Sequence, residues 1–312
     1  MTSSCSSPAR SAPRRAARYV PPTPLQDLHI LDLLELAGSQ FQAGAALAVH
    51  QSTVSRSVQL MRQQFRLVPA EGSAATCRYG HNTCLQYLRL AYREHRLMEG
   101  LLRIGTDPLH QSLLQGLEVV QQVPPRFRHG HRWAELVRLG LLDGAIVSSF
   151  SLGGPLPVDG RPTWDGLTAL PLGQLHLQLV ATAQRTRGVL LPRKLAAPGL
   201  HQTGKRLGWE VWEQPLACHE PAAWIKRAHD RQLAMPICAG LLDAAWLAAH
   251  KLVPLAQQPP LPERLWLLLP QGAVNSQAAR LSLRVLRQLV AKSSARHEPL
   301  PLLRLKAVDD SP

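Results

Sequence analysis

The fold of the N-terminal part of this chain is indicated by residues 38–56, which read Gly38-Ser39-Gln40-Phe41-Gln42-Ala43-Gly44-Ala45-Ala46-Leu47-Ala48-Val49-His50-Gln51-Ser52-Thr53-Val54-Ser55-Arg56. It has the form of a helix-turn-helix, in which an alanine-rich helix packs closely on its neighbours and a short turn follows. The next helix opens with small polar residues, whose side chains suit contact with base edges in a groove of nucleic acid.

The helix after the turn separates apolar from polar side chains. Its apolar residues recur at i, i+4, i+7 and i+11, the spacing of one helix face, and they are Val54, Val58, Met61 and Phe65. Residues 49–70 hold three arginines and no acid, a balance that suits a phosphate-lined groove. The predicted DNA-facing residues are Gln51, Ser52, Thr53, Ser55, Arg56 and Gln59, with Gln63 further along the same polar side.

This segment resembles the DNA-binding domain of LysR-type transcriptional regulators. The positions that match in register are Gly38, Ser39, Ala43, Leu47, Val49, Gln51, Ser55 and Arg56, after a first helix over residues 28–37. His50 stands where the family usually caps the recognition helix with Ser or Thr, Ser52 where Pro is common, and Gly44 where Ala is usual. The Leu-Phe-x-Arg motif that normally follows the recognition helix is missing. We therefore expect a preference for DNA sequence that differs from that of typical members of the family.

A second long helix is predicted from about Asn82 to Leu102. Its seam alternates spacings of four and three residues, as in a heptad pattern, and consists of Cys84, Leu88, Ala91, His95, Met98 and Leu102. The resemblance implies a linker helix over residues 81–100 that pairs two chains into a homodimer, with a homotetramer as the larger alternative. The residues alone leave another interpretation open, in which the stripe packs against the same chain's helix-turn-helix.

From Leu101 onward, strands and helices alternate, which favours an α/β sheet architecture. Strands are predicted at 101–106, 143–147, 175–182, 233–237, 252–255 and 264–270. Helices are predicted at 107–122, 133–140, 239–251 and 276–291. This order resembles the effector domain of LysR-type regulators, which begins Leu-Arg-Ile-Gly-Thr as residues 102–106 do.

The resemblance covers about residues 25–292 and implies a fold in three parts. An N-terminal all-α winged helix-turn-helix domain (25–80) and the linker helix precede an α/β two-lobed effector domain (101–292), which is like a periplasmic binding protein. The first lobe is expected at about 101–152 and 262–292, and the second at about 163–258. A ligand in such sheets lies beyond the carboxyl ends of the strands, near helix N-termini.

Five residues at the ends of predicted strands are therefore the predicted effector-binding residues. They are Thr106, Asp107, Ser148, Ser149 and Thr182. The alternative for each hydroxyl is a helix cap or a loop contact without a ligand. Asp107 is expected to cap the helix that follows the first strand, where its charge would repel a carboxylate. The cleft should therefore bind a neutral or cationic effector, or none.

Composition limits the function classes. The chain has 312 residues and a formal net charge of +14, which points to an acidic partner such as nucleic acid. This surplus is spread over the chain, because three acids balance the three arginines within residues 25–70. No apolar run approaches the ~20 residues of a membrane helix. The cysteines are five in number and form no Cys-x-x-Cys, which favours reduced thiols in a cytoplasmic protein.

The sequence contains no phosphate-binding loop and no His-Glu-x-x-His, so we expect no enzyme, no catalytic residue, no cofactor and no metal. His129 and His131 lie two residues apart, a spacing that could suit a metal on a strand. No third ligand has a clear spacing, and a solvated basic strand edge over residues 126–132 is the preferred interpretation. The tryptophans are interpreted mostly as core or lobe-interface anchors, with Trp209 and Trp212 as alternative cleft residues.

The two ends of the chain are expected to lie outside the folded domains, as a disordered basic arm (1–24) and a C-terminal tail (293–312). The predicted function is a sequence-specific DNA-binding transcription regulator, gated by a small-molecule effector. Expected partners are double-stranded DNA, a second copy of the chain, RNA polymerase and the effector. Two alternatives remain: a constitutive DNA binder with a decayed cleft, and a solute-binding-like module whose N-terminal helices mediate protein contacts.

Overall fold

A computed structural model describes residues 25–70, 77–80, 82–154, 160–183, 186–214, 221–256, 258 and 260–295. The expected basic arm (1–24) and most of the expected C-terminal tail (296–312) lie outside the described residues. So do residues 71–76, which follow the helix-turn-helix. On either side of that gap, the backbone N–H of Ala70 donates to the carbonyl of Arg78 at 2.7 Å.

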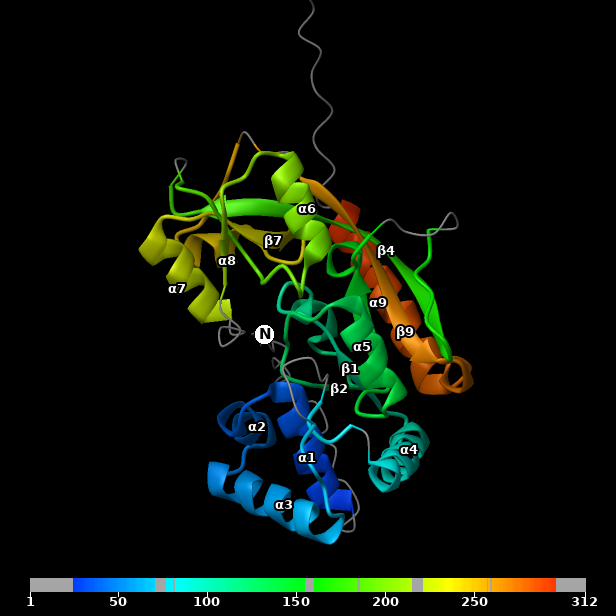
Figure 1. Ribbon diagram of the computed structural model, residues 1–312. Coiled ribbons are helices and arrows are strands. Elements are labelled where there is room, and N and C mark those ends of the chain that lie inside the picture. Colours follow the sequence, from blue (N-terminus) through cyan, green and yellow to red (C-terminus); the bar gives the residue numbers. More distant parts are fainter. Residues whose placement is uncertain are drawn as a thin grey trace, which may run out of the picture.

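The helix-turn-helix is confirmed as three helices at one end of the molecule (Figure 1): α1 (Gln26–Ala37), α2 (Gln40–Leu47) and α3 (Gln51–Gln64). Gly38 closes α1 with a φ of 78°, a conformation that glycine adopts without strain. Ser39 then caps α2, because its hydroxyl accepts from the backbone N–H of Gln42 at 3.2 Å. These two adjacent residues set the sharp angle between the first two helices.

Helix α4 (Thr83–Met98) follows and is shorter than the sequence predicts. Asn82 caps it by accepting from the backbone N–H of Leu85 at 2.9 Å. Gly100, with a φ of 71°, stops the chain from continuing as a helix. Leu102 therefore lies in strand β1 and not in the helical seam, so the prediction was wrong for this last seam position.

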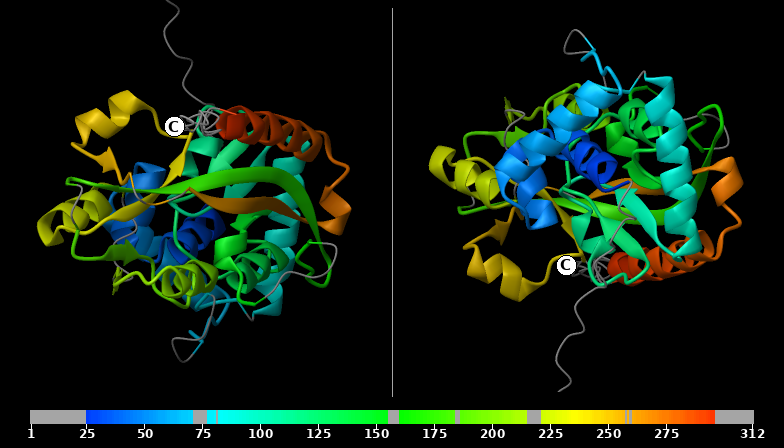
Figure 2. Two further views of the ribbon diagram at one scale, coloured as in Figure 1. Left: turned by 90° about the horizontal axis from the view of Figure 1, so that it is seen from above. Right: turned by 90° about the horizontal axis from the view of Figure 1, so that it is seen from below.

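The second half of the chain is built on a seven-stranded sheet in the described residues, with the order β2-β1-β3-β9-β4-β7 and with β8 paired to β4. These strands are β1 (Leu102–Gly105), β2 (Val120–Gln122), β3 (Gly144–Ser148), β4 (Leu167–Ala181), β7 (Met235–Ala239), β8 (Val253–Pro254) and β9 (Leu261–Pro270). The two long strands β4 and β9 pair antiparallel from Leu167↔Pro270 to Leu177↔Leu261. They run side by side across the domain and join its two lobes (Figure 2).

Helices and a small second sheet complete the two lobes. Helix α5 (Gly130–Arg138) packs on β3 and β9 in the first lobe, and α9 (Gln277–Ala295) packs on β4. The other lobe carries α6 (Pro198–Arg206), α7 (Pro221–Arg231), α8 (Ala244–Ala249) and the parallel pair β5 (Val189–Leu191) and β6 (Val211–Glu213). An N-terminal helical part followed by a two-lobed α/β domain is the fold class that the sequence predicts.

Two predicted helices and one predicted strand are wrong or displaced. Residues 107–122 do not form one helix: a 3-10 turn, η2 (Gln111–Leu114), is followed by Gly116 with a φ of 77°, and the chain then enters β2. The helix expected over 239–251 is only α8, because Gly240 adopts a φ of 79° and Asp243 caps a later start. Residues 126–129 are irregular chain that leads into α5, so the expected basic strand is absent among these described residues.

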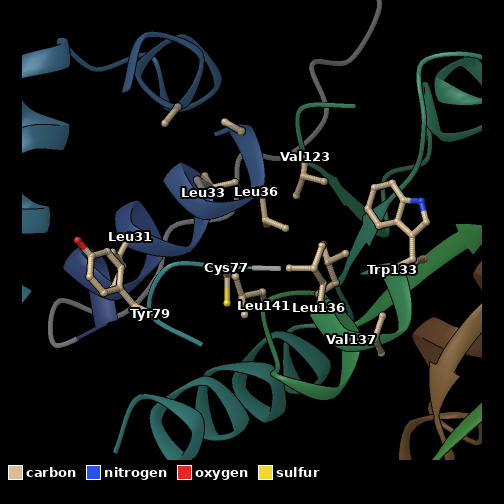
Figure 3. Close-up of a cluster of buried hydrophobic side chains, with 14 of the residues drawn as sticks. Leu31, Leu33, Leu36, Cys77, Tyr79, Val123, Trp133, Leu136, Val137 and Leu141 are labelled. Carbon is tan, nitrogen blue, oxygen red and sulfur yellow. The ribbon is translucent and has the colours of Figure 1, made fainter. Parts of the chain in front are cut away.

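The helix-turn-helix shares one hydrophobic core with the first lobe. Leu31, Leu33 and Leu36 of α1 lie in the same buried cluster as Leu136 and Leu141 of the other domain, as Figure 3 shows. Since a shared core resists separation of its two sides, the helix-turn-helix is fixed against the first lobe. The expected domain boundaries at residues 80 and 100 stay predictions, and the core does not divide at either of them.

Candidate functional site

The predicted DNA-facing residues lie together along the exposed side of α3. Gln51, Ser52, Ser55, Arg56 and Gln59 are exposed, and Thr53 is half-buried. The opposite face is buried in the core through Val54, Val58 and Met61, as the spacing predicts. Because its apolar and polar side chains lie on opposite faces, α3 keeps its polar face on the surface. A helix needs such an exposed face to enter a groove of DNA.

His50 caps α3, at the position where Ser or Thr is usual in the family that this segment resembles. Its Nδ1 accepts from the backbone N–H of Ser52 at 3.3 Å and lies 2.9 Å from the Ser52 hydroxyl. Gln51 is also held locally, because its Nε2 donates to Oε1 of Gln40 at 3.1 Å. Two of the predicted base-facing side chains are therefore positioned by neighbours before any partner binds.

Gly44 allows the turn between α2 and α3 to pack closely. A Cβ on Gly44 would lie 2.9 Å from the carbonyl oxygen of Val49, closer than side chains normally approach. Ala is usual at this position in the family that the segment resembles. Gly44 fits here because the turn passes too close to α2 to leave room for a Cβ.

A cleft of about 500 Å³ lies between the turn after β1 and the elements of the other lobe. One side is formed by η2 and its neighbours, including Leu109, Gln111 and Gln115. The other side is formed by α7, β7 and α8, including Trp224 and Trp246. Phe127 lies 5.1 Å from Trp224 between ring centroids, so aromatic surface lines the space. The described lining residues include one acid, Asp243, and no lysine or arginine.

None of the five predicted effector-binding residues lines this cleft. Asp107 and Ser148 both line a separate small hollow of about 10 Å³, which is too small for an organic ligand. Ser148 exchanges hydrogen bonds with Ser151 in a capping box, and the Ser149 hydroxyl accepts from the backbone N–H of Arg264 at 3.2 Å. Thr182 follows β4 and is half-buried. Thr106 is buried, and its hydroxyl has no hydrogen-bond partner among the described residues.

Asp107 caps the turn that follows β1, as predicted. Its Oδ1 accepts from the backbone N–H groups of Leu109 at 2.9 Å and His110 at 3.3 Å. It caps a turn and not a long helix, so the helix dipole that would attract an anion is small here.

His110 is completely buried next to Asp107 and two residues from distant strands. Its Nε2 lies 2.9 Å from Oε2 of Glu263 on β9, and its Nδ1 lies 2.9 Å from Oδ1 of Asp107. Cys238 on β7 contacts the same ring. Burial by itself lowers the pKa of His110, but the carboxylates of Asp107 and Glu263 outweigh it and raise that pKa well above its ordinary value. Burial raises the pKa of the Cys238 thiol to about 11.

The two histidines singled out by the sequence do not converge on a metal. His129 caps α5, since its Nδ1 accepts from the backbone N–H of His131 at 3.1 Å. The two rings stack with centroids 5.2 Å apart, and Trp164 Nε1 donates to His131 Nδ1 at 3.2 Å. Nearby, burial lowers the pKa of Arg128 to about 9, and this guanidinium donates to the carbonyl of Leu36 at 2.6 Å.

A buried ionic network joins α1, α4 and the first lobe. Asp32 of α1 contacts Arg89 of α4 at 2.7 Å and Arg103 of β1 at 3.4 Å. Arg96 of α4 donates through Nε to Oδ2 of Asp143 at 2.8 Å. All five side chains are fully buried. This network was not predicted, because nothing in the spacing of these residues along the sequence shows that they meet.

The helices in the described part of the chain include none that is long and apolar enough to cross a membrane.

No protein-family model matches the chain, and the comparison with curated proteins also found no match. Solved structures do match it. ArgP from Mycobacterium tuberculosis has a TM-score of 0.44 and 19% identity, over 85% of this chain and 96% of that one. CbnR in complex with its target DNA has a TM-score of 0.43 and 13% identity, over 86% of this chain and 99% of that one.

Full-length LysG from Corynebacterium glutamicum with bound effector Arg has a TM-score of 0.39 and 15% identity, over 86% of this chain and 98% of that one. Many of the matched structures are LysR-family transcriptional regulators, the family that the helix-turn-helix residues resemble. TM-scores below 0.5 leave the function to be argued from the residues themselves.

Proposed function

We propose that this chain is a sequence-specific DNA-binding transcription regulator of the LysR type. The observation that carries the proposal is the exposed polar side of α3, with Arg56 and Gln59 on the surface and Val54, Val58 and Met61 buried behind them. A helix that is anchored on one side and polar and cationic on the other fits the major groove, where base edges and phosphates are both within reach.

The seam along α4 supports pairing of two chains. The seam positions Cys84, Ala91 and Met98 are exposed, and Leu88 and His95 are half-buried. Met98 exposes 82% of its surface, and together with the exposed Cys84 and Ala91 of the same seam it favours a partner surface. A dimer would present two recognition helices to half-sites that are separated by whole turns of DNA. A homotetramer and a contact with RNA polymerase are further expectations from the family resemblance.

The cleft between the lobes is proposed as the effector site. Aromatic and aliphatic side chains dominate its lining, with Gln111, Ser112 and Gln115 as polar groups that can orient a ligand. Because the described lining holds an acid and no cation, it favours a neutral or cationic effector with an apolar or aromatic body. This agrees with the sequence-based expectation for ligand charge but moves the site away from Thr106, Ser148, Ser149 and Thr182.

DNA binding is tested with a gel-shift titration on the DNA upstream of the chain's own gene, at several salt concentrations. Arg56→Ala should weaken binding and lower the salt slope by about one unit if the side chain contacts a phosphate. If it reads a guanine, the variant should instead lose about 1–3 kcal/mol of discrimination at one base pair. The matched control is Arg284→Ala, an equally charged and exposed position on α9. Equal titrations for wild type, Arg56→Ala and Arg284→Ala would reject the assignment.

A further inference from the structure

Three buried side chains with metal-binding atoms meet at the base of the cleft, although they are far apart in the sequence. His110 follows β1, Glu263 lies on β9 and Cys238 lies on β7. One ligand atom from each lies within 4.8 Å of the other two, and each residue is at least 99% buried. Cys238 also lines the cleft, so the cluster borders that cavity.

We propose that His110, Cys238 and Glu263 form a binding site for a divalent transition metal ion of the zinc or cobalt class. Imidazole, thiolate and carboxylate are the three ligand types that such ions use, and a mixed set of this kind selects against magnesium and calcium, which prefer oxygen alone. Three protein ligands leave a fourth tetrahedral position, which a water molecule or a ligand in the cleft would occupy.

The spacing of the ligand atoms suits an ion after a small adjustment. With zinc bonds of about 2.0–2.1 Å to N and O and about 2.3 Å to S, tetrahedral geometry puts two ligand atoms roughly 3.3–3.6 Å apart. His110 Nε2 and Glu263 Oε2 are 2.9 Å apart, and the whole set falls within 4.8 Å. Small side-chain rotations would bring the three ligand atoms to bonding positions, because their separations lie close to this range.

Asp107 supplies the outer contact that metal-binding histidines commonly have. When Nε2 binds the ion, Nδ1 carries the proton, and Oδ1 of Asp107 is 2.9 Å away. Asp107 is itself fixed by the backbone N–H groups of Leu109 and His110. It therefore acts as a positioning residue that orients the imidazole and raises its basicity.

An ion pair without metal accounts for only part of this cluster. A histidine between two carboxylates explains His110, Asp107 and Glu263, and it leaves the buried Cys238 thiol as no more than a hydrogen-bonding neighbour of the imidazole. A metal ion would bind His110, Cys238 and Glu263 directly, and Asp107 would orient the imidazole. The ion would also connect β7, on one side of the cleft, to the turn after β1 on the other side, so that metal binding and ligand binding in the cleft would influence each other reciprocally.

The test is a titration of the reduced, full-length protein with Co²⁺, followed by Zn²⁺ competition. One Co²⁺ per chain should bind and produce the near-ultraviolet charge-transfer band of a cobalt–thiolate bond, and Zn²⁺ should abolish that band. Cys238→Ser should lose the band. Cys84→Ser, an exposed cysteine on α4, is the matched control and should keep it. Asp107→Asn should weaken Zn²⁺ binding by about 10-fold or more.

Circular dichroism in the absence of metal establishes whether each variant is folded. If Cys238→Ser fails to fold, Glu263→Gln takes its place as the test of the site. Folded wild-type protein that gives no charge-transfer band would overturn the proposal, as would a band that persists in Cys238→Ser or disappears in Cys84→Ser. A Zn²⁺ affinity that is unchanged in both Asp107→Asn and Glu263→Gln would also overturn it. DNA binding is measured separately, so failure here leaves the proposed function intact.

Discussion

Arg89 of α4 donates through Nε to Oδ1 of Asp32 on α1 at 2.7 Å, and both side chains are completely buried. The contact connects residues 57 positions apart and crosses from the helix-turn-helix to the following helix. Arg103 of β1 approaches the other oxygen of Asp32 at 3.4 Å, so one carboxylate joins three elements. A charge in this position is tolerable only because its partners are equally fixed.

We expect Asp32→Ala to destabilise the protein by about 3–5 kcal/mol, since it leaves Arg89 and Arg103 buried without their shared carboxylate. Chemical denaturation followed by circular dichroism measures the loss. Asp230→Ala is the control, because Asp230 forms exposed ion pairs with Lys226 and His229, and its loss should be much smaller. Similar losses in the two variants would show that the buried network contributes no more than a surface pair.

Glu35 predicts a pH dependence of stability. Burial raises the pKa of this carboxyl above its ordinary value of 4.5, although the backbone N–H of Arg78 and the charge of Arg89 oppose the shift. Because the pKa is higher in the folded state than in the unfolded state, the stability that Glu35 contributes is full below pH 4.5 and is lost as the pH rises through the raised value. Glu35→Gln keeps an acceptor for Arg78 but cannot ionise.

The free energy of unfolding of Glu35→Gln, relative to wild type, should therefore increase as the pH rises from about 4.5 towards neutral. Thermal melts across this pH range measure the difference. Glu94→Gln, at an exposed position on α4, gives the background. A difference between Glu35→Gln and wild type that is constant with pH, or that decreases as the pH rises, would contradict the burial of an ionisable carboxyl here.

The seam on α4 predicts the oligomeric state. Leu88→Asp combined with Met98→Asp puts two charges into the expected contact between chains, and light scattering should then report a monomer in place of a dimer. Leu281→Asp, an exposed leucine on α9, is the control and should leave the dimer unchanged. A dimer that survives the double substitution would favour the other interpretation of the seam, packing within one chain.

The cleft predicts which compounds stabilise the protein. Neutral or cationic aromatic compounds should raise the melting temperature, and a compound present at 100 times its dissociation constant contributes about 2.7 kcal/mol. Trp224→Ala should abolish this ligand-induced shift, whereas Trp212→Ala, on β6 outside the lining of the cleft, should retain it. Simple carboxylates should give no shift. Stabilisation by a carboxylate that depends on Trp224 would show that the charge of the lining does not select the effector.

Some elements are predicted correctly from patterns that lie within a few residues of one another in the sequence. The spacing of Val54, Val58 and Met61 identifies the buried face of α3, because a helix repeats its faces every 3.6 residues whatever surrounds it. The caps at Ser39 and Asp107 follow from the same kind of short-range geometry, since each oxygen reaches an N–H two or three residues away. Strands β1 and β3 were also predicted, at residues 101–106 and 143–147, and every residue of both observed strands is buried.

Contacts between residues far apart in the sequence, and the local structures that depend on them, form only in the tertiary fold. Residues 107–122 carry leucines at spacings that suit a helix, but pairing of β2 with β1 and the conformation of Gly116 hold them in a turn and a strand. Asp32 and Arg103, which are 71 residues apart, meet only when α1 docks on the first lobe. His110 and Glu263 are separated by 153 residues. A contact between such residues leaves no periodic trace in a sequence, because its free energy depends on the position of the partner and not on local chain geometry.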